Sequence, residues 1–121
     1  MGTDSRLSVQ VTKLSAYALV TATGTVEPAT HPLLIHHLNR ALQMTRVAVI
    51  IDMSAVDFCD SSGFNAIAHT LRRATQPTPP LVLVDPSDRI RRAMAVTALE
   101  PVHTHADLDS AVRWLETGTP H

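Results

Sequence analysis

The chain is short of several residue types, and each shortage narrows what it can be. Its 121 residues include a single cysteine, Cys59, so no disulfide can form within the chain and a disulfide-stapled secreted scaffold is excluded. Aromatic residues make up only 3% of the composition, so the core has to be built from aliphatic side chains. No apolar run approaches the ~20 residues that span a bilayer, so a membrane protein is not expected.

An excess of basic residues is also missing. The formal net charge is −1, whereas proteins that grip nucleic acid usually carry a basic surplus or patch and aromatic rings that stack on bases. Residues 1–6 are polar and contain no apolar signal core. These features predict a cytoplasmic protein that binds neither nucleic acid nor a membrane.

What is present suits one compact domain. A length of 121 residues is typical of a single domain, and 45% apolar residues are enough for an ordinary core. We therefore expect one domain over 1–121, with no internal repeat and no domain boundary.

The first part of the chain predicts a β-hairpin. Residues 1–5 are expected to form a loose terminus, and the alternation over 7–12 has the period of a strand with one buried face. A second strand is predicted over 17–26, joined to the first by a turn at 14–16. Gly24 lies where that strand can bend or be approached closely by another backbone.

A helix and a buried strand follow. The segment 27–30 breaks the second strand, and Thr30 or Pro32 opens a helix with its apolar positions on one face. Val47–Ile51 is apolar on both alternating faces, which is typical of a central parallel strand covered on both sides. A short polar turn is expected between this strand and Asp60.

The rest of the chain alternates helices and strands. A helix is predicted after Gly63, with Phe64, Ile67, Ala68 and Leu71 spaced to face the core, and it ends at the proline-rich segment 76–80. Residues 81–84 form a buried strand, and Asp85-Pro86 reads as the N-cap and first turn of a helix. A last edge strand over 101–104 and a closing helix over 106–116 complete the chain.

The predicted order is therefore β-β-α-β-α-β-α-β-α. A hairpin followed by alternating strands and helices indicates an α/β domain with a mixed, mostly parallel sheet and four helices.

The stretch Asp60-Ser61-Ser62-Gly63 is the place where chemistry is most plausible. It joins the end of a buried strand to the start of a helix, and its simplest role is to cap the helix N–H groups, with Gly63 permitting close packing. A nucleophilic serine would need a base and an oxyanion site, and would have to borrow groups such as His103 and Asp85 that no pattern connects to it. A third possibility is a phosphoacceptor, because a phosphate at a helix start meets unpaired N–H groups and the positive end of the helix dipole.

Three segments together resemble the STAS domain family of anti-sigma-factor antagonists. They are the strand and turn that lead into Asp60-Ser61-Ser62-Gly63-Phe64, the strand and helix over 81–94, and Gly24-Thr-Val-Glu27. The resemblance covers about residues 7–117, and Asp-Ser-Ser-Gly in this position and order is a specific signal, although the tetrapeptide alone is not.

The resemblance implies a phosphorylation switch and no catalysis by this chain. In that family an unmodified antagonist binds an anti-sigma factor that is also a serine kinase, and so frees the sigma factor for transcription. The kinase holds the ATP and phosphorylates the antagonist, the complex dissociates, and a phosphatase restores it. The matching acceptor is Ser61, with Ser62 as a fallback, and no cofactor is implied.

The resemblance also implies a docking surface. Its residues are Glu27, Asp60, Ser61, Ser62, Gly63 and Phe64. Glu27 departs from the aspartate usual in the family and moves the charge by about one methylene. An alternative within the same fold is a binding subunit that is never phosphorylated, as in lipid-transport or stressosome-like assemblies.

The remaining candidates are weaker. His103 and His105 share one face of the predicted edge strand and would need a third ligand to hold a metal, so no metal site is predicted. Cys59 is expected to be a small buried residue, with oxidation next to Asp60 as the sharper alternative. The arginines near 72–73 and 89–92 are expected on solvated faces, with guidance of an acidic partner as the lesser possibility.

Overall fold

The protein is described by a computed structural model that defines residues 2–3, 6–74, 79–95 and 102–117. The strands are β1 (Gly2–Thr3), β2 (Leu7–Leu14), β3 (Tyr17–Val26), β4 (Val49–Cys59), β5 (Leu81–Val84) and β6 (Val102–His105). The helices are α1 (His31–Met44), α2 (Ser61–Ala74), α3 (Asp88–Met94) and α4 (Leu108–Thr117). The predicted α/β class and element order are confirmed, with β1 as an addition.

The strands lie in one sheet in their sequence order, β1-β2-β3-β4-β5-β6. β2 and β3 pair antiparallel as the predicted hairpin, and β3 through β6 are parallel. The expectation of a loose terminus over 1–5 is wrong in part, because Gly2–Thr3 pairs antiparallel with β2. A strand of two residues is too short to show the alternation of apolar and polar positions by which strands are recognised in a sequence.

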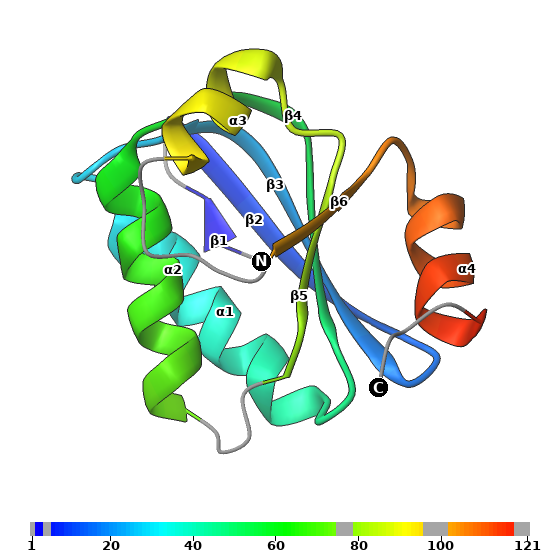
Figure 1. The fold of residues 1–121 in the computed structure, drawn as a ribbon. Helices are drawn as coiled ribbons and strands as arrows, with labels where there is room; N and C mark the ends of the chain where they lie inside the picture. Colours follow the sequence, from blue (N-terminus) through cyan, green and yellow to red (C-terminus); the bar gives the residue numbers. More distant parts are fainter. Residues whose placement is uncertain (1, 4–5, 75–78, 96–101, 118–121) are drawn as a thin grey trace.

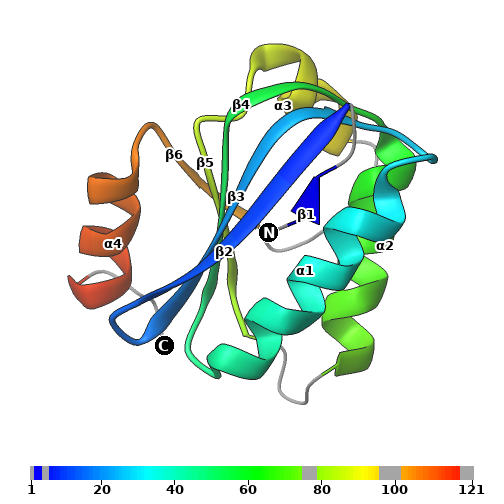
Figure 2. The ribbon, with the colours of Figure 1, turned by 180° about the vertical axis from the view of Figure 1, so that it is seen from behind.

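The helices cover the two faces of the sheet unequally. α1 and α2 pack side by side on one face, α4 lies on the opposite face, and α3 lies across one end (Figure 1 and, from behind, Figure 2). The larger core lies under α1 and α2, and a smaller cluster that includes Tyr17, Ile50 and Val82 lies under α4. No helix within the described ranges is long and apolar enough to cross a membrane.

The helix faces predicted from periodicity are confirmed. In α1 the shared apolar positions are buried, and in α2 Phe64, Ile67, Ala68 and Leu71 all lie in the larger core. Central β5 is buried at all its residues, as expected for a parallel strand covered on both sides.

β4 differs from the sequence prediction at both ends. Val47 is 50% exposed and precedes the strand, which begins at Val49. The polar turn expected before Asp60 is wrong, because β4 continues to Cys59. Its pairing with β3 contains two register shifts, and beyond Asp52 it outruns β5, so its polar residues lie in an exposed strand extension.

The start of α3 also differs from the prediction. Asp85 adopts a left-handed backbone with φ of 52° and lies before the helix, so it is not the N-cap. The cap is Ser87, whose hydroxyl accepts a hydrogen bond from the Ile90 N–H at 3.2 Å. Prediction of the helix end over 76–80 falls largely on residues outside the described ranges.

Gly24 confirms the close backbone approach predicted as one of its two possible roles. Its φ is 114°, which L side chains rarely adopt, and a Cβ at this position would collide with the carbonyl oxygen of Arg6. The same carbonyl accepts a hydrogen bond from the Thr25 N–H at 2.8 Å, so the close approach is part of the β2–β3 pairing.

Candidate functional site

The predicted site residues lie at one end of the sheet. Parallel β3 and β4 both finish there, and α1 and α2 both begin there (Figures 1 and 2). The Asp60 N–H donates to the Val26 carbonyl at 3.4 Å, which ties the start of α2 to the end of β3. Two helix N-termini at one edge give this end of the molecule two positive dipole ends. The first N–H groups of α1 are already paired, because His31 donates to the Glu27 carbonyl at 2.9 Å and Leu33 donates to the Thr30 carbonyl at 3.1 Å.

Asp60 is the N-cap of α2. One carboxylate oxygen accepts the Gly63 N–H at 2.8 Å, and the other accepts the Ser62 hydroxyl at 2.9 Å. Burial works to raise the pKa of Asp60, but the hydrogen bonds from Ser62, Gly63 and His31 outweigh it and lower that pKa below its usual value. Asp60 is therefore held as an ionised carboxylate that fixes the geometry of the turn.

Ser61 is the first residue of α2 and is half-buried. Its hydroxyl makes no hydrogen bond with any residue in the described part of the chain, whereas that of its neighbour Ser62 is engaged by Asp60. The two serines are therefore different in kind: Ser62 supports the cap, and Ser61 presents an uncommitted hydroxyl at the helix start.

His31 is one of two residues near the predicted site that sequence reasoning missed. It is the first residue of α1, and its Nε2 lies 3.1 Å from the Asp60 carboxylate, with 16% of the His31 side chain exposed. Since an ionised carboxylate only accepts, Nε2 is the donor. This contact joins the starts of α1 and α2 across 29 positions of sequence, so no local pattern could reveal it.

Gly63, Phe64 and Cys59 face inward. A Cβ at Gly63 would come within 3.1–3.2 Å of Val26, Asp60 and Cys59 atoms, so the absent side chain permits the close packing predicted for it. Phe64 has no exposed surface, so it can affect a docking surface only indirectly, by seating α2. Burial, and then the Asp60 charge, raise the pKa of the Cys59 thiol to about 12, which disfavours the thiolate that oxidation requires.

Glu27 lies at the same end but belongs to a separate ion pair. Its carboxylate contacts the Arg6 guanidinium, and its main chain is fixed by Thr30, whose hydroxyl accepts the Glu27 N–H at 2.9 Å. Thr30 also donates to the Thr25 carbonyl at 2.9 Å. The structure thus places Glu27 beside the helix starts, with its carboxylate paired to Arg6 and not hydrogen-bonded to the residues of the α2 cap.

Phe58 is a second residue missed from the sequence. It is 37% exposed, one of two large exposed hydrophobic residues in the described part of the chain, and directly precedes Cys59 in the extension of β4. The register shift opposite Gly24 and Thr25 sets which side chains of this extension face outward. An apolar ring near a polar helix start is a feature of protein-binding surfaces.

The histidines considered as metal ligands have other surroundings. His103 and His105 pack on Trp114, with ring centroids 4.3 Å and 5.5 Å from the indole. Within the described ranges, no three His, Cys, Asp or Glu side chains are grouped so that they could hold a metal ion.

The sequence pattern of the STAS domain matches residues 8–111. The chain belongs to the STAS domain family. The end of the sheet described above therefore carries the Asp-Ser-Ser-Gly sequence within a STAS fold, with Asp60 as cap and Ser61 as the uncommitted hydroxyl. A search of curated proteins found no match.

Solved structures share this fold at low sequence identity. An anti-sigma factor antagonist from Mycobacterium paratuberculosis is 23% identical, with a TM-score of 0.77, covering 96% of this chain and 99% of that one. The phosphorylated form of the Bacillus cell fate determinant SpoIIAA is 16% identical, with a TM-score of 0.64 and coverage of 88% and 98%. The murine anion transporter Slc26a9 is 17% identical, with a TM-score of 0.73, covering 88% of this chain but 19% of the transporter.

Proposed function

We propose that this STAS protein is an anti-sigma-factor antagonist that binds an anti-sigma factor with serine kinase activity and is released when Ser61 is phosphorylated. The observation that supports the proposal most directly is that the polar side chains at the start of α2 have different roles. Asp60 caps the helix and engages Ser62, which leaves the Ser61 hydroxyl uncommitted within the described part of the chain.

The local electrostatics support a two-state switch at Ser61. A phosphate there would add about −1.5 to −2 charges close to the ionised Asp60. The free N–H groups and dipole end of α2 favour that charge, so the fold can tolerate it. A partner docked on this surface, which includes the exposed Phe58, would meet a charged and hydrated phosphate on Ser61. The modification is therefore expected to weaken binding.

The docking surface that we propose is the end of the sheet where α1 and α2 begin. Asp60, Ser61 and Ser62 lie on it, Glu27 borders it, and Gly63 and Phe64 support it from beneath. His31 and Phe58 are added to that set by the structure. The kinase partner supplies the ATP, a phosphatase reverses the modification, and neither a membrane nor nucleic acid takes part.

A catalytic role receives no support from the site geometry. The imidazole near the helix start, that of His31, is hydrogen-bonded to Asp60, and no base in the described part of the chain is hydrogen-bonded to the Ser61 hydroxyl. Ser61 is therefore proposed as a receiver of phosphate. Failure of the protein to label with a serine-reactive phosphonate is the expected result, and labelling at Ser61 would contradict it.

The proposal is tested by binding to candidate anti-sigma kinases. Wild type and Ser61→Ala are expected to bind, and Ser61→Asp is expected to lose binding because the added carboxylate imitates part of the phosphate charge. The matched control is Ser87→Asp, which places the same change at the start of α3. Loss of binding in both Asp variants would point to a nonspecific charge effect and contradict a switch at Ser61.

A second function on the same fold is a binding subunit that is not phosphorylated. It is favoured by the likeness to a segment of an anion transporter, in which the matching fold is part of a larger protein. In that case Ser61→Asp would leave partner affinity unchanged, and incubation with a kinase and ATP would add no mass.

A further inference from the structure

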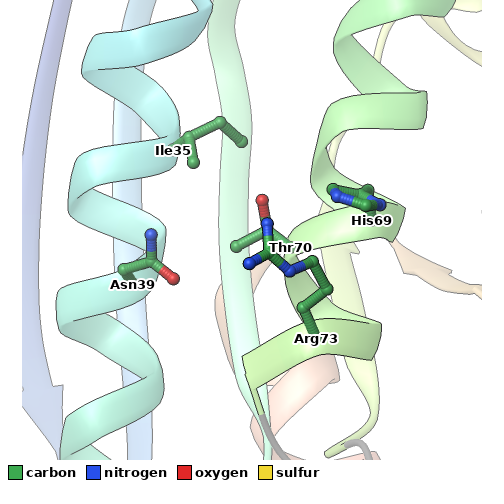
Figure 3. Close-up of a pocket in the computed structure, with 5 residues that line it drawn as sticks. All are labelled: Ile35, Asn39, His69, Thr70 and Arg73. Atoms are coloured by element: carbon green, nitrogen blue, oxygen red, sulfur yellow. The ribbon is translucent and has the colours of Figure 1, made fainter.

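A groove between α1 and α2 lies well away from the proposed switch. It has a volume of about 350 Å³ and is lined by Ile35, Asn39, His69, Thr70 and Arg73. Figure 3 shows Ile35 and Asn39 on α1 facing the gap, with Thr70 and the Arg73 guanidinium opposite them on α2. Arg73 is twelve positions beyond Ser61, which is about 18 Å along the helix axis.

The two helices that form this groove carry charge of one sign only. Neither α1 nor α2 contains an aspartate or glutamate, and the residues at 75–78 that follow α2 contain none either. The basic side chains on α1 and α2 are Arg40, Arg72 and Arg73, and histidines accompany them on both helices. A chain with net charge −1 thus concentrates positive charge on the face that holds the groove.

The donors in the groove are not used by the fold. Asn39, His69 and Arg73 make no side-chain hydrogen bond or ion pair with any residue that the structure describes. Thr70 differs, because its hydroxyl donates to the Ala66 carbonyl at 2.8 Å. Three donor side chains from two helices therefore line one groove, and no aspartate or glutamate is among its lining residues.

We propose that this groove binds a small organic phosphate. A guanidinium matches two phosphate oxygens with parallel hydrogen bonds, and the amide of Asn39 and a ring N–H of His69 supply further donors to the third. The volume exceeds that of a phosphate group and falls at the lower end of the range for small-molecule sites. Ile35 offers an apolar wall to the carbon portion of the ligand.

This site is separate from the proposed switch and does not rest on it. Its ligand would contact the C-terminal half of α2, whereas the switch lies at the N-terminus of the same helix. Binding of a ligand at Asn39, His69 and Arg73 therefore tests this proposal independently of the switch.

The test is an NMR titration of the full-length, ¹⁵N-labelled protein at constant ionic strength. The probes are butyl phosphate, inorganic phosphate and hexanoate. Butyl phosphate is expected to cause saturable shifts at the amides of Asn39 and Thr70–Arg73, with weaker binding of inorganic phosphate, which lacks the alkyl contact. Shifts that do not saturate, or that centre on Ser61, would overturn the proposal.

Matched variants separate a built site from general charge. Arg73→Gln is expected to weaken butyl phosphate binding by about tenfold or more, and Arg73→Lys by less, because lysine keeps the charge but loses the fork of donors. Arg40→Gln removes the same charge from α1 outside the groove lining and is expected to change affinity by no more than about twofold. Equal losses in Arg40→Gln and Arg73→Gln, or equal binding of hexanoate, would contradict a phosphate site.

Discussion

Two of the junctions that lead from a parallel strand into a helix have a serine near the helix start, and they use it in opposite ways. Between β4 and α2, Asp60 caps the helix and Ser61 follows with its hydroxyl uncommitted within the described residues. Between β5 and α3, Asp85 stands outside the helix and Ser87 itself becomes the cap. A serine at a helix start is thus available for modification only where another residue has taken over the capping.

The third helical residue differs between the same two junctions. In α2 it is Gly63, whose missing side chain lets the helix approach Val26 and Cys59 closely. In α3 it is Ile90, which has no exposed surface and fills part of the larger core. One junction is held by close backbone approach, and the other by a side chain inserted into the core.

The largest expected effect is at Ile90. Replacing it with alanine leaves a cavity where α3 meets the core, and we expect a loss of about 2–5 kcal/mol in the free energy of unfolding. Urea unfolding followed by circular dichroism measures it. A loss below about 1 kcal/mol would mean that α3 collapses readily around the gap and is not anchored by this side chain.

Gly63→Val is expected to cost somewhat less. The added atoms would press on Val26, Asp60 and Cys59, with an overpacking cost of about 1–3 kcal/mol in the free energy of unfolding. Thermal unfolding checks the stability. Binding of the proposed partner should also weaken, because α2 must move outward to make room. An unchanged melting temperature would show that close approach at Gly63 is not required.

Removing the cap of α2 comes next. Asp60→Ala should lower the free energy of unfolding at neutral pH by about 1–2 kcal/mol, because the Gly63 N–H loses its acceptor. The effect should depend on pH. The pKa of Asp60 is lowered in the folded protein, so its stabilisation is present above the unfolded-state pKa of about 3.9 and is lost as the pH falls through the lower folded value.

Measurement of unfolding free energy from pH 7 down to the acid limit of folding checks this dependence. The gap between wild type and Asp60→Ala should narrow only below about pH 4. Ser87→Ala serves as the control, because the α3 cap contains no ionisable group and its effect should not change with pH. A gap that is constant with pH would contradict the ionised cap.

The smallest expected effect separates the two serines. Ser61→Ala should change the free energy of unfolding by less than about 0.5 kcal/mol, since its hydroxyl has no hydrogen bond in the described structure to lose. Ser87→Ala should cost about 1 kcal/mol, because it removes a cap. Equal costs in paired denaturation curves would erase the distinction between the junctions.

Much of the fold could be predicted from local sequence. Alternation over residues 7–12, with a second strand expected over 17–26, predicted the hairpin, and the apolar spacing from Phe64 to Leu71 predicted the buried face of α2. These patterns work because each records which side of a single element meets the core. The Asp-Ser-Ser-Gly segment predicted the start of α2 to within one turn, because the helix begins at Ser61 and not after Gly63.

Features that depend on neighbours could not be predicted in this way. The polar residues before Asp60 resembled a turn, but pairing with β3 keeps them in a strand that extends past β5. The N-cap of α3 was predicted at Asp85 but is Ser87, because Asp85 adopts a left-handed backbone before the helix begins. His31 entered the site only through the packing of α1 beside α2, a contact between residues 29 positions apart.

The central claim is that Ser61, freed from capping by Asp60, receives the phosphate. The most direct measurement is to incubate the protein with ATP and an anti-sigma kinase that it binds, and to locate the modification by peptide mass mapping. We predict one phosphate, on Ser61, which disappears in Ser61→Ala and persists in Ser87→Ala. No gain in mass, or a phosphate that remains when Ser61 is replaced, would contradict the account.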